Sequence, residues 1–71
     1  MSEIEELETQ QYVNRLRLSC IEAAVKRAEP FSEEFDNLVE EAIRIRRTIE
    51  LLGTKILLTK QRALLEEGEL D

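Results

Sequence analysis

Residues that are mostly apolar recur along the chain at alternating spacings of three and four positions. This is the pattern of one buried face of an α-helix. The clearer set lies in the second half of the chain: Phe35, Leu38, Ala42, Ile45, Ile49, Leu52, Ile56, Thr59 and Ala63. A weaker set precedes it: Ile4, Leu7, Gln11, Asn14, Leu18, Ile21, Val25 and Ala28. We therefore predict two long amphipathic helices, each with one apolar seam.

The two sets are separated at Pro30. A residue that precedes proline is pushed out of the α region, so Glu29 should end the first helix. Ser32 is a favourable N-cap for the second, and Glu33 and Glu34 follow where the helix dipole favours anions. The prediction is a first helix at about 2–28, a turn at 29–32 and a second helix at about 33–67, which Gly68 would end.

A turn this short places two long helices side by side and antiparallel. Residue i then lies near residue 62 − i, which brings the acidic start of the chain close to Lys55 and Lys60. It also brings Lys26 and Arg27 close to the acidic residues after the turn. The predicted fold class is all-α, an antiparallel helical hairpin that forms one domain over residues 1–71.

Polar and flexible residues inside the seams carry separate predictions. A polar residue in a seam costs stability but penalises misalignment, so Asn14 is expected to set the register or the choice of partner. Gly53 costs its helix about 1 kcal/mol relative to alanine. It predicts either a bend or a close approach of the other helix.

Each helix also carries apolar residues outside its seam. They are Val13, Leu16, Cys20 and Ala23 on the first helix and Leu51, Leu57, Leu58, Leu64 and Leu65 on the second. Because a hairpin covers one face of each helix, a second copy of the chain is the simplest source of further helices. We predict a homodimeric four-helix bundle. The candidate residues for the dimer interface or for binding a partner are Leu16, Cys20, Leu51, Leu57, Leu58, Leu64 and Leu65.

Two alternatives remain for the stretch from Leu57 to Leu65. If Gly53 shifts the phase of the helix, these leucines continue the internal seam. If it does not, they form a docking surface for a different protein near the end of the rod.

Length and composition make association necessary. A 71-residue hairpin has a single seam, and domains this small usually need disulfides, a metal or a partner. With one cysteine and no histidine, the chain offers neither a disulfide within itself nor the usual metal ligands. Association with a partner is therefore the remaining source of stability. The lone Cys20 fits a reducing, cytoplasmic setting. No apolar run approaches the roughly 18 residues of a membrane span, and the net charge of −6 disfavours nucleic acid and anionic membranes.

A basic band is expected in the middle of the rod: Arg15, Arg17, Arg44, Arg46 and Arg47. Arginine can grip phosphates, a nucleic-acid backbone or an acidic protein surface. The favoured interpretation is that Glu40, Glu41 and Glu50, within a turn of the band, neutralise it in exposed pairs.

Nothing in the sequence indicates catalysis or a cofactor, because the chain lacks histidine, a glycine-rich phosphate loop and spaced metal ligands. In architecture the hairpin resembles small regulators that are dimeric or bound to partners, such as secretion chaperones and quorum-sensing antiactivators. The expected function is a non-enzymatic interaction module that binds and modulates another protein. A structural subunit of a hetero-oligomeric helical complex is the alternative, and nucleic-acid binding through the arginines is a weaker one.

Overall fold

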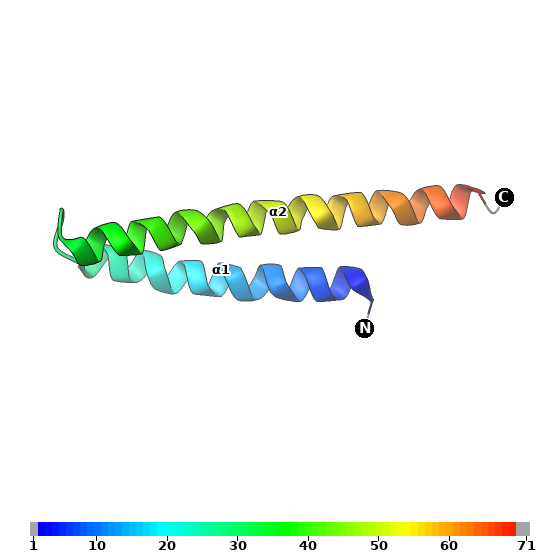
Figure 1. Cartoon of the computed structure of the whole chain (residues 1–71). Coiled ribbons are helices and arrows are strands. Elements are labelled where there is room, and N and C mark those ends of the chain that lie inside the picture. Colours follow the sequence, from blue (N-terminus) through cyan, green and yellow to red (C-terminus); the bar gives the residue numbers. More distant parts are fainter. Residues whose placement is uncertain (1, 70–71) are drawn as a thin grey trace.

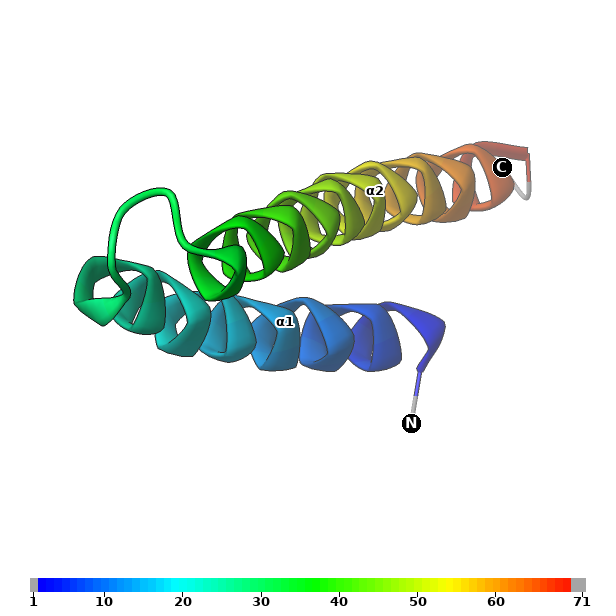
Figure 2. The same cartoon turned by 60° about the vertical axis from the view of Figure 1, so that its left-hand side comes forward.

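The computed structural model describes residues 2–69. It contains two helices, α1 (Glu3–Arg27) and α2 (Glu33–Glu69), and no strand within the described residues. The helices lie side by side and antiparallel in a rod of 60 × 18 × 12 Å (Figures 1 and 2). The predicted all-α hairpin is therefore confirmed.

The helix ends follow the expected capping chemistry with one exception. The Glu5 amide donates to Ser2 Oγ at 3.1 Å, which caps α1. The Phe35 amide donates to Ser32 Oγ at 3.1 Å, so Ser32 is the N-cap of α2 as predicted. The prediction that Gly68 ends the second helix is wrong, because α2 continues through it to Glu69. A helical glycine costs only about 1 kcal/mol, so it does not by itself stop a helix.

Phe31 occupies an unusual place at the tip of the hairpin. Its φ of 66° lies in the left-handed region, and 94% of the residue is exposed. For a bulky L-residue this conformation costs roughly 1–2 kcal/mol, and the exposed ring recovers little of it by packing. Phe31 therefore costs the folded hairpin stability without contributing to its core.

We expect Phe31→Gly to raise the free energy of unfolding by about 1 kcal/mol, because glycine adopts positive φ without strain. Phe31→Ala is the matched control, since it removes the ring but keeps a Cβ in the left-handed conformation. Thermal denaturation followed by circular dichroism compares the two. Equal stabilities for the glycine and alanine variants would show that the backbone at residue 31 is not strained.

The core of the hairpin is the predicted seam. Ile45, Leu52 and Ile56 are buried, with 8%, 5% and 9% of their surface exposed. The other predicted seam residues are half-buried on both helices, except Ala63. Ala63 is exposed because α1 begins at Glu3 and does not reach that level of α2.

A glutamine in the seam connects the two helices and fixes their register. Gln11 Nε2 donates to the Ile49 carbonyl at 3.4 Å, and it lies 3.3 Å from the place a Cβ on Gly53 would take. Of the two predictions for Gly53, the close approach is confirmed. Asn14 instead donates to the Gln10 carbonyl of its own helix at 2.8 Å, so the polar link across the seam comes from Gln11.

Charged residues pair across the helices in part as expected. Glu8 and Lys60 lie 3.8 Å apart, which confirms that the acidic start of the chain meets the second half of α2. Among the described side chains, neither Lys26 nor Arg27 forms an ion pair with the acidic residues after the turn. Exposed pairs of long side chains gain little over their hydrated state, so a favourable register alone does not bring them together.

Candidate protein-interaction surfaces

All seven predicted interface candidates lie on the outside of the hairpin. The six leucines expose between 51% and 70% of their surface, and Cys20 is an exposed free thiol. The alternative in which Gly53 shifts the helix phase is wrong, because Ile56 is buried and Thr59 half-buried beyond it. The leucines from 57 to 65 are therefore not part of the hairpin's own core.

One broad surface of the rod is marked by the cross-helix ion pairs, and we call it the ion-pair face. Glu8 pairs with Lys60, and Glu22 pairs with Arg46 at 3.4 Å. Residues three or four positions from these members share their side of the helix. By this spacing the ion-pair face also carries four exposed apolar residues: Tyr12 of α1 and Ile43, Leu57 and Leu64 of α2.

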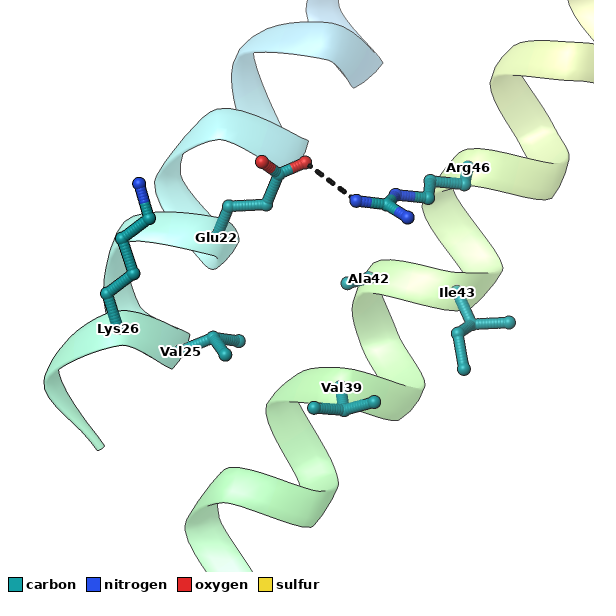
Figure 3. Close-up of a pocket in the computed structure, with 7 residues that line it drawn as sticks. All are labelled: Glu22, Val25, Lys26, Val39, Ala42, Ile43 and Arg46. Atoms are coloured by element: carbon teal, nitrogen blue, oxygen red, sulfur yellow. Dashed lines mark hydrogen bonds and ion pairs between the residues drawn. The ribbon is translucent and has the colours of Figure 1, made fainter. Parts of the chain in front are cut away.

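The ion-pair face contains an apolar groove near the turn (Figure 3). The side chains of Val25 and Ala42 point into the space between the helices, while Ile43 points away from α1. The groove has a volume of about 280 Å³, and its charged rim consists of Glu22, Lys26 and Arg46. Its shape and lining suit an apolar side chain from another protein.

The opposite broad surface carries the remaining candidates, and we call it the Cys20 face. A shallow groove there brings Val13, Leu16 and Cys20 of α1 together with Glu41 of α2. Arg44 follows Glu41 by three residues, and three leucines continue from it at intervals of seven: Leu51, Leu58 and Leu65. Residues seven apart stay on one side of a helix in a heptad seam.

The structure therefore divides the candidates, which the prediction had treated as one set. Leu57 and Leu64 belong to the ion-pair face, and the other five belong to the Cys20 face. The predicted candidates did not include Tyr12 and Ile43, although the spacing of these residues from Glu8 and Arg46 could have placed them on the ion-pair face. Phe31 was missed because no local pattern signals a left-handed phenylalanine.

The predicted arginine band is not one cluster. Arg46 pairs with Glu22 on the ion-pair face, whereas Arg44 lies 3.9 Å from Glu40. Arg17 lines the groove of the Cys20 face, and Arg47 lines a separate hollow with Glu50. Seven residues separate Arg15 from both Glu8 and Glu22, which places it on the ion-pair face. Of the expected neutralising residues, Glu40 is confirmed, and Glu22 was not foreseen because it comes from the other helix.

Two other kinds of site, a membrane span and a metal centre, are not found among the described residues. Neither helix, over its described residues, combines the length and apolar character needed to cross a membrane. The described residues contain no cluster of three or more potential metal ligands of the histidine, cysteine and carboxylate types. No protein family model, curated protein sequence or solved structure matches the chain.

Proposed function

We propose that this chain is a small non-enzymatic interaction module of the cytoplasm, a homodimeric regulator or adaptor that binds and modulates another protein. The observation that supports this proposal is the imbalance of its apolar surface. Among residues 2–66, ten large hydrophobic side chains are exposed, whereas three are buried. Contiguous exposed apolar surface on a small chain is typical of a binding surface.

The division into two faces supports two kinds of contact. The hairpin buries a single seam, and a second copy packed on one face would complete a four-helix core. The opposite face would then remain available to a different protein. On the ion-pair face, the apolar groove near the turn has a charged rim, and Leu57 and Leu64 add exposed apolar surface toward the open end. Such a combination of apolar surface and charged rim is typical of specific transient interfaces.

Self-association is tested by sedimentation equilibrium of the wild-type chain over a range of concentrations. We expect a species of twice the 8.3 kDa chain mass, and a thermal midpoint that rises with concentration as mass action requires. A folded monomer at all concentrations would remove the homodimer from the proposal.

Binding of a second protein is tested by affinity capture with a matched variant. Leu57→Lys/Leu64→Lys changes only two exposed residues of the ion-pair face. A protein retained by the wild type and lost by this variant, with helicity and dimer mass unchanged, would support the adaptor role. Identical retention by both chains would show that the ion-pair face is not the docking surface.

A further inference from the structure

The charged residues of the ion-pair face are sorted by sign along the rod. The half nearer the turn carries three cations and one carboxylate: Arg15, Lys26, Arg46 and Glu22. The half at and beyond the level of Gln11, which contacts the Ile49 carbonyl, carries three carboxylates and one cation: Glu5, Glu8, Glu50 and Lys60. Spacings of three or four from a member of an ion pair place Glu5, Lys26 and Glu50 on this face. One half of the face is therefore basic and the other acidic.

Two cations of the basic half have no carboxylate partner among the described side chains. Arg46 pairs with Glu22, whereas neither Arg15 nor Lys26 forms an ion pair there. Lys26 stands at the rim of the apolar groove, to one side of the Glu22–Arg46 pair (Figure 3). A ligand that fills the groove would bring its flanking residues close to this positive charge. Carboxylates on the ligand would suit that position.

Apolar positions of α2 continue along the same face from the groove to the open end. Ala42 lines the groove, and Leu57 and Leu64 are 58% and 68% exposed. Leu64 follows Ala42 by 22 residues, which corresponds to about 33 Å at 1.5 Å per residue. The apolar surface is therefore a long, straight line parallel to the rod.

A line of this shape fits a helix better than an extended segment. The two helices bond their own backbone groups, so within the described residues they offer no strand edge to which an extended segment could add. A helix brings its own backbone hydrogen bonds and presents apolar side chains along one side at intervals of three and four. An amphipathic helix of about 22 residues would match the 33 Å length.

We infer that the ion-pair face binds an amphipathic helix of a different protein, with the acidic end of that helix over the groove and its basic end beside Leu57 and Leu64. The inference rests on the proposed function and specifies the chemistry and direction of the partner. At the acidic end, an apolar side chain fills the groove while neighbouring carboxylates meet Lys26 and Arg15. At the basic end, apolar side chains cover the two leucines while cations meet Glu8.

The direction is tested with a synthetic helical peptide of about 22 residues that has leucines at heptad spacing. Glutamates flank the leucines of one end and lysines those of the other. A nitroxide is attached to either end, and the broadening of backbone amide signals of the wild-type chain is measured by NMR. We expect the acidic-end label to broaden Val39 and Ala42 and the basic-end label to broaden Leu57 and Leu64. The reverse pattern, or equal broadening by both labels, would overturn the inference.

The charge dependence is tested with Lys26→Glu/Arg15→Glu, which leaves the Glu22–Arg46 pair in place. Its affinity for the peptide should be at least about tenfold weaker than that of the wild type, because two attractions become repulsions. Fluorescence anisotropy of a labelled peptide measures the change, and circular dichroism checks that the helices persist.

The matched control is Arg27→Glu/Arg47→Glu, which changes the net charge of the chain by the same amount. Neither residue belongs to the ion-pair face, since Arg27 follows Cys20 by seven residues and Arg47 lines a separate hollow. Peptide affinity of this variant should equal that of the wild type. Equal losses for both variants would indicate a general effect of charge and overturn the proposed contacts.

Sedimentation of the chain with the peptide separates failure of this inference from failure of the proposed function. We expect one peptide per chain, with the mass of the homodimer otherwise unchanged. Peptide binding that dissociates the dimer would show that a second copy occupies the ion-pair face, and would overturn the inference. Absence of peptide binding would also overturn it. The adaptor role would still be decided by affinity capture with wild type and Leu57→Lys/Leu64→Lys.

Discussion

Replacing Leu52 with alanine is expected to lower the free energy of unfolding by about 2–5 kcal/mol, the largest effect of any single truncation in the chain. Leu52 is the most buried residue of the seam, with 5% of its surface exposed. Removing its branched end leaves a cavity between the helices, and the small core has few other contacts to compensate. At moderate temperature the variant should be largely unfolded, since small domains have little stability to lose.

The control for this truncation is Leu57→Ala, which removes the same atoms from a residue of α2 that is 58% exposed. Its effect on the hairpin should be smaller than about 1 kcal/mol. Urea denaturation at equal protein concentration compares the two variants, because association adds a concentration-dependent part to the stability. Similar losses for both would mean that α2 is rotated from the described orientation.

The second large effect is expected on association. Leu58→Lys/Leu65→Lys should weaken self-association by at least about tenfold, equivalent to about 1.4 kcal/mol. Both leucines are exposed in the single hairpin, so the lysines meet water in the monomer and apolar surface in the proposed dimer. Sedimentation equilibrium measures the change, and circular dichroism at high concentration reports whether the helices persist.

Leu57→Lys/Leu64→Lys introduces the same charge at the adjacent positions of the ion-pair face, and its dimer should be unaffected. If the two double variants lost association equally, added charge itself would be responsible. If neither lost it, Leu58 and Leu65 would not be part of the interface.

The seam, the turn and the register could be predicted because they depend on short-range rules. Three-and-four spacing fixed which side of each helix is buried, and Pro30 followed by Ser32 fixed where one helix ends and the next begins. The Gln11 contact places that residue level with Leu51, as the fold-back about the turn requires. These features need no information beyond neighbouring residues and a compact turn.

Other features depend on geometry that spacing alone does not contain. The exposed arginines were treated as one band, but their two faces become distinct only when Glu22 of α1 is placed beside Arg46 of α2. The polar contact across the seam came from Gln11 instead of Asn14, because an amide on the longer side chain reaches the Ile49 carbonyl. The left-handed backbone at Phe31 follows from closing the turn, and residue preference alone would place glycine there.

The unequal lengths of the helices give the open end a different kind of stability from the rest of the rod. From Gln61 to Glu66 the described side chains of α2 are all exposed, because α1 does not extend beside them. A short helical stretch without a neighbour is held only by its own backbone hydrogen bonds, which are marginal in water. Its amide hydrogens should therefore exchange with solvent much faster than those from Ile45 to Ile56. Since Leu64 and Leu65 belong to opposite faces, slowed exchange at this end would report occupation of either face without any added label.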